Sequence, residues 1–205
     1  MDIIYMHQYY RTPDQDGGTR SYEMARRLAD AGHHVTVITT DTDAPAGQHD
    51  WRVTRSGLVT VHYAPVAYGN TMGTRARLTA FQAFAAAATE RARGLHRADV
   101  VLASSTPLTA AIPGVRAARH HGAPLVLEIR DVWPEVPIAL GELPIGPARW
   151  AASALERWAY RNADHIVALS PDMARSIRRR TSPDAHIAAG SGRAPAAPPP
   201  ARERG

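Results

Sequence analysis

Short runs of β-branched and aliphatic residues alternate along this chain with patterns typical of amphipathic helices. The expected strands span residues 2–6, 34–40, 99–103, 125–129 and 165–169, and the expected helices span 19–31, 75–93, 108–121, 148–162 and 173–180. A strand, one helix and a second strand form a crossover connection, which places the two strands parallel in one sheet. The sequence therefore predicts an α/β fold, a doubly wound parallel sheet covered by helices on both faces.

Two segments depart from this alternation. Residues 51–54 and 58–63 flank Ser56-Gly57 and predict a small β-hairpin insertion. Residues 188–205 contain no Ile, Leu, Val, Met, Phe, Tyr or Trp, so this stretch cannot bury enough apolar surface to become ordered. We expect one domain over residues 1–182 and a disordered tail over 183–205, in which only 186–189 is apolar enough to begin a strand.

Composition excludes several classes of function. The absence of cysteine removes disulfide bonds, thiolate catalysis and cysteine-ligated metal sites. The net charge of +5 points at first sight to nucleic acid, but residues 1–174 hold 17 arginines and 17 acidic residues. The excess lies in the remaining 31 residues, where seven arginines face only Asp184 and Glu203. Such a tail binds polyanions weakly and without sequence choice, so we expect no nucleic-acid partner.

The N-terminus and the length of the longest apolar stretch indicate where in the cell the protein is located. The first ten residues, MDIIYMHQYY, lack the basic region and cleavage site of a signal peptide. The longest low-polarity stretch, Ala83–Ala88, is far shorter than the ~20 residues of a membrane span. We therefore expect a cytoplasmic protein that contacts the membrane at most peripherally.

A doubly wound sheet binds ligands at the carboxyl ends of its strands, so the loops that follow the strands are the places to search. The first of these loops ends in Asp16-Gly17-Gly18-Thr19, directly before a helix. Paired glycines let the backbone approach an oxyanion, and the free N–H groups of a helix N-terminus attract it. Gly17 and Gly18 are therefore candidate phosphate-binding residues, with a tight turn that binds nothing as the alternative.

A dinucleotide site is a competing interpretation of the same loop. Asp41 ends the second strand 23 residues after Gly18, near the spacing at which an acid binds a ribose. The loop does not read G-x-G-x-x-G, however, and it is longer than a dinucleotide loop. We expect Asp41 to be a solvated loop residue instead.

Charged residues gather where the strand 125–129 ends. Arg130 and Asp131 follow it, and this pair suits the orientation of a substrate hydroxyl or the stabilisation of developing charge. A structural ion pair or a helix cap is the alternative. Glu128 lies inside the strand, and a buried carboxylate requires a partner, which we expect to be an arginine or a backbone donor.

The histidines do not have the spacing of a metal site. His33-His34 and His120-His121 close helices, where their polarity suits the surface, and no third ligand stands at a suitable spacing. His7 lies at the mouth of the first strand, where it either contacts a ligand or caps the strand. We expect no metal ion.

Three segments together resemble glycosyltransferase family 4 of the GT-B fold. The first is the opening strand, the glycine loop, the helix that ends in Ala-Gly-His and the strand Val-Thr-Val-Ile-Thr-Thr. The second, Glu128–Glu135, reads EIRDVWPE and is similar to the branch acting on polysaccharide and lipid-linked sugar acceptors. The third, Ala163–Met173, resembles the last strand and helix of the N-terminal domain in that family. The likeness spans residues 1–182.

The resemblance implies a Rossmann-like domain that forms one half of a GT-B enzyme, the half that holds the acceptor. The other half binds a nucleotide sugar, such as a UDP- or GDP-sugar, as co-substrate, with no bound cofactor or metal. By resemblance, Gly17 and Gly18 approach the donor diphosphate, and Asp131 and Arg130 are the catalytic pair. His7, Trp133 and Glu135 are then the acceptor-binding residues.

Two departures from the family shape the functional hypothesis. Many members place a histidine before the aspartate, where this chain has Arg130. The donor-binding half is missing, and the tail has the composition of GC-rich DNA read out of frame. We expect the N-terminal domain of a retaining glycosyltransferase, truncated and inactive alone. The alternative is a non-catalytic domain that docks a donor-side subunit or an acceptor, using Trp133, Ile138, Leu140 and Leu143.

Overall fold

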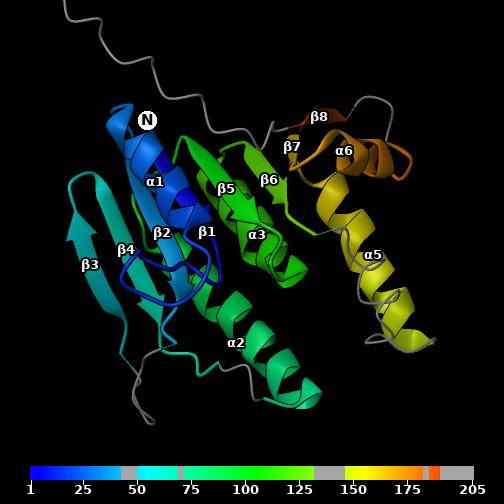
Figure 1. The fold of residues 1–205 in the computed structure, drawn as a ribbon, viewed down its shortest axis with the longest axis horizontal. Coiled ribbons are helices and arrows are strands. Elements are labelled where there is room, and N and C mark those ends of the chain that lie inside the picture. The colour runs from blue at the N-terminus through cyan, green and yellow to red at the C-terminus, as the bar shows by residue number, and fades with distance from the viewer. Residues whose placement is uncertain (43–49, 69–71, 132–145, 182–184, 190–205) are drawn as a thin grey trace, which may run out of the picture.

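The computed structural model describes residues 1–42, 50–68, 72–131, 146–181 and 185–189 (Figure 1). Strands and helices alternate through most of this part of the chain, as the sequence predicts. Their order is β1 (Asp2–Met6), α1 (Arg20–Asp30), β2 (His34–Thr40), β3 (Arg52–Ser56), β4 (Val59–Ala64), α2 (Thr74–Arg93), β5 (Val100–Ser104), the 3-10 turn η1 (Leu108–Ala110), α3 (Ala111–His121), β6 (Leu125–Ile129), α5 (Pro147–Arg161), β7 (His165–Ala168), α6 (Pro171–Arg178) and β8 (His186–Ala189).

All the described strands belong to one sheet, in the order β3-β4-β2-β1-β5-β6-β7-β8. Every neighbouring pair is parallel except β3 and β4, which confirms the predicted doubly wound α/β class. The predicted hairpin is present and turns at Gly57, whose φ of +57° favours glycine. It extends the main sheet instead of standing apart from it, because β4 pairs with β2 from Val35–Val59 onward.

The sheet reaches further along the chain than the expected domain boundary at residue 182. β8 pairs in parallel with β7, in a register that sets His165 opposite His186. Residues 186–189, which fall within the range expected to form a tail, are therefore an edge strand of the domain. Residues 190–205 lie outside the described residues.

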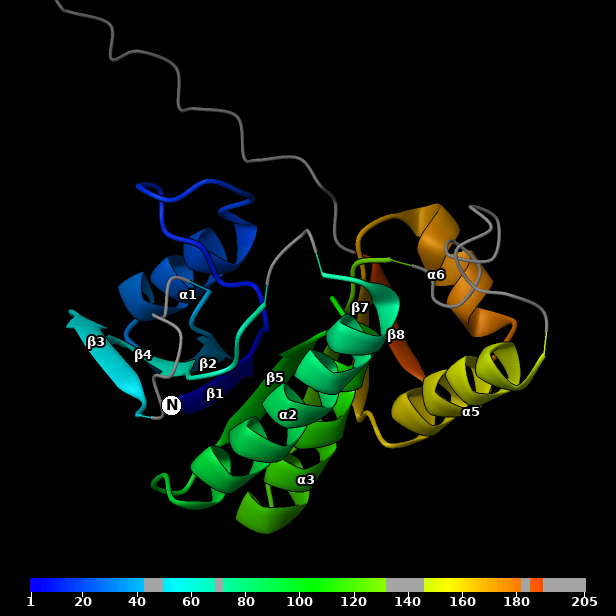
Figure 2. The same ribbon diagram turned by 90° about the horizontal axis from the view of Figure 1, so that it is seen from below.

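Both faces of the central strands are buried, which explains their nearly continuous apolar sequences. In β1, Ile3 and Tyr5 pack in the cluster that also holds Ala25 of α1, whereas Ile4 and Met6 pack in the larger cluster of the opposite face. Figure 2 shows α1 on one side of the sheet and α2 and α3 on the other. None of the described helices is long and apolar enough to cross a membrane.

Local chemistry sets several element boundaries. The hydroxyl of Ser170 accepts a hydrogen bond from the Met173 amide and caps α6, as its position before Pro171 predicts. Gly122 ends α3 in the left-handed conformation, with a φ of +63°. Inside α3, Gly114 lies so close to β5 that a Cβ there would stand 2.7 Å from the Cβ of Ala103. The absence of a side chain at Gly114 thus sets the distance between this helix and the sheet.

The topology itself points to one place on the sheet. From β1 the chain first builds outward through β2 and β4, and it then returns through α2 to build in the other direction from β5. The strand order therefore reverses between β1 and β5. In open α/β sheets, ligands bind at the carboxyl ends of the strands beside such a switch point.

Candidate functional site

His7 and Arg130 meet at this switch point, although 122 residues separate them in the sequence. His7 follows β1 and is 1% exposed. Nη1 of Arg130, which follows β6, lies 3.3 Å from Nε2 of His7. A guanidinium only donates hydrogen bonds, so Nε2 is the acceptor and the proton of the neutral ring is assigned to Nδ1.

The electrostatic surroundings keep His7 neutral. Burial, followed by the positive charge of Arg130, lowers the pKa of His7 to about 3, while the backbone of Tyr9 acts in the opposite direction. A second anchor comes from the hydroxyl of Ser105, which accepts a hydrogen bond of 3.1 Å from the Arg130 amide. Arg130 is therefore held from both its side chain and its backbone.

Asp131, the next residue along the chain, is exposed. The structure thus places a fixed guanidinium directly before a solvent-accessible carboxylate at the carboxyl end of β6. Trp133 and Glu135, the other two residues of this segment expected to act at the site, lie outside the described residues, as do Ile138, Leu140 and Leu143.

The buried carboxylate of Glu128 has the arginine partner that the sequence predicts. Nε and Nη2 of Arg20 donate to Oε1 of Glu128 at 3.1 and 2.9 Å, and the Ser104 hydroxyl donates to Oε2 at 2.9 Å. Glu128 is 1% exposed, whereas the Arg20 side chain is 43% exposed. Arg20 begins α1, so this ion pair joins the start of α1 to the end of β6.

The glycine loop immediately before α1 lies next to this ion pair along the chain. Gly17 has a φ of +128°, and a Cβ on it would stand 3.3 Å from Cγ of Arg11. A Cβ on Gly18 would meet no atom within 4 Å, so its backbone faces open space. The side chain of Thr19 makes no capping hydrogen bond to the first turn of α1. The loop has the shape needed for a phosphate to approach the backbone.

Several buried polar side chains at this edge make no hydrogen bond within the described part of the chain. Gln8 is fully buried, and neither its amide nitrogen nor its amide oxygen has a partner. The hydroxyls of Ser21, Thr40, Thr106 and Thr109 are in the same situation. Buried polar groups are nearly always paired in folded proteins, so their concentration beside the switch point indicates a polar site.

These polar residues and Arg20 were not predicted as site residues from the sequence. The sequence held one signal for the polar residues. Three apolar strands end at or just before Gln8, Thr40 and Ser104–Thr106. Because the carboxyl ends of parallel strands share one edge of the sheet, these side chains are brought to the same edge. No pattern in the sequence pointed to Arg20, because its partner lies 108 residues away.

Asp41 corrects one prediction. It is 2% exposed, and its two carboxylate oxygens accept hydrogen bonds of 2.8 Å from Nε and Nη2 of Arg52. The expectation of a solvated loop residue was wrong, because the antiparallel strand β3 begins at the carboxyl end of β4, and its first residue, Arg52, reaches Asp41 at the end of the neighbouring strand β2. This carboxylate therefore serves an ion pair that attaches the hairpin.

The paired histidines serve local structure. Nδ1 of His34 lies 3.2 Å from a carboxylate oxygen of Asp2, and Nε2 of His121 lies 2.9 Å from the carbonyl oxygen of Ala92. Within the described ranges, no group of three or more His, Asp or Glu side chains is placed to hold a metal ion.

Comparisons with known proteins bear on the family and the fold. Residues 17–189 match the model of a family described as glycosyl transferase 4-like domain. The fold is similar to that of sucrose-phosphate synthase from Thermosynechococcus elongatus, with a TM-score of 0.69 and 16% identity over 92% of this chain and 47% of that chain. No curated protein sequence gives a significant match.

Two further solved structures are similar. The catalytic domain of starch synthase IV from Arabidopsis thaliana, bound to ADP and acarbose, gives a TM-score of 0.59 and 13% identity over 86% of this chain and 46% of that one. The α,α-trehalose 6-phosphate synthase from Burkholderia multivorans gives 0.55 and 14%, over 87% and 42%.

These identities show the fold alone, and this chain spans less than half the length of each of these three chains. The family model, by contrast, covers most of the chain. With its Rossmann-like doubly wound sheet, one half of a GT-B fold, this chain belongs to the family of glycosyl transferase 4-like domains.

Proposed function

We propose that this chain is the acceptor-side domain of a retaining, nucleotide-sugar-dependent glycosyltransferase of glycan or glycolipid biosynthesis, and that it is inactive without a donor-binding domain. The observation that carries the proposal is the arrangement at the switch point. Arg130 is held by His7 and Ser105 beside the exposed Asp131, and the pair of Glu128 with Arg20 joins this strand end to the helix that follows the glycine loop.

Each part of the arrangement has a role in this proposal. Gly17 and Gly18 approach the donor diphosphate, and the start of α1 offsets its charge without a metal ion. Asp131 positions and polarises the acceptor hydroxyl, with Arg130 stabilising the charge that develops beside it. Trp133 and Glu135 complete the acceptor site. The burial of His7 favours a role in holding Arg130 over direct contact with the acceptor.

The test combines this chain with a donor-binding domain. The chain is fused to a donor-binding domain from a related transferase, and sugar transfer is measured with UDP- and GDP-sugars. Asp131→Asn and Arg130→Ala are each expected to lower kcat at least about 100-fold, because they remove groups that act on the reacting hydroxyl. Glu90→Gln, which alters an exposed carboxylate on α2, serves as the matched control. Transfer unaffected by Asp131→Asn removes Asp131 from the mechanism.

A non-catalytic domain that docks a separate donor-side subunit is the second candidate function. It is favoured by the share of the similar enzymes that this chain covers, which is less than half of each. Size-exclusion chromatography with light scattering, combined with affinity capture, distinguishes the two. A monomer that captures no partner counts against docking.

We also propose that the domain works in the cytoplasm at the inner face of the membrane. Leu78 on α2 and Trp150 on α5 are 53% and 71% exposed, within the first turns of helices that start at the carboxyl edge of the sheet. Arg75 and Arg149 are exposed on the same turns. Large apolar side chains beside cations suit contact with anionic lipid.

Vesicle sedimentation tests this contact. The double variant Leu78→Ser/Trp150→Ser is expected to lose binding to phosphatidylglycerol vesicles, whereas Val53→Ser, which removes an exposed apolar side chain from the edge strand β3, is expected to retain it. If the unmodified chain does not sediment with these vesicles, the membrane proposal is wrong.

A further inference from the structure

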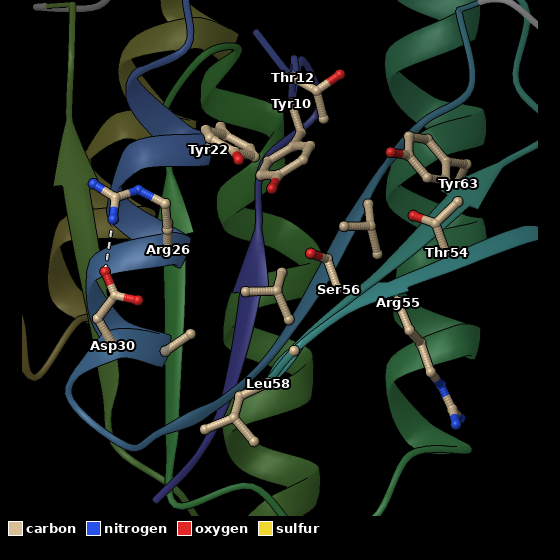
Figure 3. Close-up of a pocket in the computed structure, with 14 residues that line it drawn as sticks. Tyr10, Thr12, Tyr22, Arg26, Asp30, Thr54, Arg55, Ser56, Leu58 and Tyr63 are labelled. Carbon is tan, nitrogen blue, oxygen red and sulfur yellow. Dashed lines mark hydrogen bonds and ion pairs between the residues drawn. The ribbon is translucent and has the colours of Figure 1, made fainter. Parts of the chain in front are cut away.

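A cavity lies between α1 and the β3–β4 hairpin, and neither Arg20 nor Glu128 lines it. It has a volume of about 460 Å³ and is enclosed by the loop after β1, by α1 and by the β3–β4 hairpin (Figure 3). The strand β4 contributes Val59, Val61 and Tyr63, alternate residues that share one face of the sheet. This volume falls in the range of small-ligand sites, roughly 300–1,000 Å³.

The lining combines hydroxyl groups with an aliphatic floor. Hydroxyl-bearing side chains are Tyr10, Thr12, Tyr22, Thr54, Ser56 and Tyr63, and the aliphatic ones are Ala29, Leu58, Val59 and Val61. In Figure 3, Tyr10 and Tyr22 lie together at one end of the cavity, with Tyr63 and Thr54 across from them. The rings of Tyr10 and Tyr22 have centroids 6.3 Å apart and are tilted by 54°.

The charges around the cavity are largely neutralised by one another. Arg26 donates to Asp30 at 2.7 Å and to Glu23 at 3.0 Å, so its charge is already compensated on the rim. Arg55 is exposed on the opposite rim. An anionic ligand needs cations that remain available to it, whereas a neutral polar ligand needs groups that both donate and accept hydrogen bonds, which hydroxyls do.

The aromatic wall is held rigid from behind. The guanidinium of Arg52 lies 3.6 Å from the centroid of the Tyr63 ring, and the same guanidinium is paired with the buried Asp41. Burial and the nearby Tyr63 and Tyr22 raise the pKa of Tyr10, so its hydroxyl stays protonated at neutral pH. A preformed wall with fixed hydroxyls lowers the entropic cost of ordering side chains on binding.

We propose that this cavity is a binding site for neutral saccharides. The C–H faces of a sugar ring lie against the half-buried ring of Tyr22 and the aliphatic floor, behind which Tyr10 and Tyr63 are almost fully buried. Sugar hydroxyls exchange hydrogen bonds with the accessible hydroxyls of Thr54 and Ser56. The inference goes beyond the proposed function, because the site needs neither a donor domain nor Arg130 and Asp131.

The alternation of the hairpin supplies a matched pair of variants. Thr54 lines the cavity, whereas Thr60 on β4 lies on the opposite face of the sheet. Replacing either threonine by valine conserves shape and β-propensity and removes only a hydroxyl. Tyr22→Ala, in which a half-buried ring on α1 is removed, tests the aromatic wall.

The experiment is an NMR titration of the ¹⁵N-labelled 205-residue chain with maltose, cellobiose and lactose in the millimolar range. We expect saturable shifts at amides of α1 and the hairpin with at least one sugar. Thr54→Val is expected to weaken that binding about three- to tenfold, as the loss of one neutral hydrogen bond does, and Tyr22→Ala about tenfold or more. Thr60→Val is expected to bind as the unmodified chain does.

Other outcomes overturn the inference. They are the absence of saturable shifts with all three sugars, shifts that map elsewhere, or equal affinity in Thr54→Val and Thr60→Val. Sedimentation equilibrium tests whether a second copy of the chain occupies the cavity instead of a sugar. A dimer that forms without sugar and buries these residues would show that it does. Because no readout involves sugar transfer, failure here and failure of the transferase proposal are separate results.

Discussion

At the scale of single residues, buried charge governs the behaviour of the carboxyl edge. His7 stays neutral because burial and Arg130 both oppose its protonation. Glu128 stays buried because Arg20 and Ser104 bond both of its oxygens. Each of these side chains has an arginine partner from a distant part of the sequence, Arg130 for His7 and Arg20 for Glu128. Substitutions that remove the partner therefore cost more than substitutions that remove the charge itself.

His7 gives the domain a pH-dependent stability. Its pKa is about 3 in the folded state and about 6.5 when unfolded, so the unfolded chain binds the proton more readily. The free energy of unfolding is therefore highest above pH 6.5 and declines as the pH falls towards 3. Between pH 7 and pH 5, we expect His7 to account for a loss of about 2 kcal/mol.

Urea unfolding at several pH values measures this loss. His7→Gln is expected to flatten the pH dependence, whereas His34→Gln, at an exposed histidine, is expected to leave it unchanged. Equal slopes for the unmodified chain and His7→Gln below pH 6.5 contradict the assignment.

The ion pair between Arg20 and Glu128 is predicted to respond asymmetrically. Arg20→Met leaves a buried carboxylate with only Ser104 as donor, and we expect a loss of about 3–5 kcal/mol in the free energy of unfolding. Glu128→Gln removes the buried charge and keeps an oxygen that accepts from Arg20, and the 43% exposed Arg20 side chain is also reached by water. We therefore expect a loss of about 1–2 kcal/mol in the free energy of unfolding. Arg26→Met, at exposed pairs of the same helix, is the control, with a loss below about 1 kcal/mol. Urea unfolding decides, and a Glu128→Gln loss as large as that of Arg20→Met contradicts the argument.

At the scale of elements, close packing of α3 on β5 positions the loop that carries Ser105 and Thr106. The helix approaches the strand at Gly114, where no side chain separates the two backbones. The hairpin is attached differently, through Arg52 and Asp41. Small residues thus allow α3 to pack closely on the sheet, whereas an ion pair adds to the β2–β4 pairing that holds the hairpin at its edge.

Gly114→Ala is predicted to destabilise the domain although alanine favours helices. The added Cβ meets the Cβ of Ala103 at 2.7 Å, and overpacking of this kind costs roughly 1–3 kcal/mol, more than the ~1 kcal/mol that helix propensity returns. Adding Ala103→Gly is expected to restore part of the loss, because it removes the atom that is contacted. Thermal unfolding of the single and double variants provides the measurement, and a more stable Gly114→Ala variant would show that α3 has room to move.

At the scale of the whole molecule, one domain presents one edge of a site. This chain covers 47%, 46% and 42% of the three solved enzymes that have the same fold. In the proposed function, the donor's base and ribose contact a domain that this chain does not supply. Gly17, Gly18 and the start of α1 are then its only phosphate-facing groups within the described residues.

The chain by itself is accordingly predicted to bind nucleotide sugars weakly. A few charge-assisted hydrogen bonds contribute about 1–3 kcal/mol each, against an association cost of at least ~4 kcal/mol. We expect a Kd in the millimolar range or weaker, so calorimetry with UDP-glucose and GDP-mannose at micromolar protein should show no measurable heat. A micromolar Kd that disappears in Gly18→Leu would mean that one domain suffices as a nucleotide site.

The order of strands and helices follows from the sequence alone, because both depend on residues close together in the chain. The local signals are the spacing of apolar residues, the serine directly before α6, the proline at its first position and the glycine after α3. The structure confirms the elements that they predict. The need of Glu128 for a partner was equally visible, since the cost of burying a carboxylate depends on the residue itself.

Only the tertiary structure decided which residues meet. Arg20 reaches Glu128, Arg52 reaches Asp41, and β4 joins β2 through contacts between segments that no local pattern relates. The cavity beside α1 likewise exists because α1 lies over the face of the sheet to which the hairpin contributes β3 and β4. Local propensity acts over a few residues, whereas these pairings depend on the folded path of the whole chain. The sequence therefore showed that Glu128 needs a partner, and only the tertiary structure determined which residue that partner is.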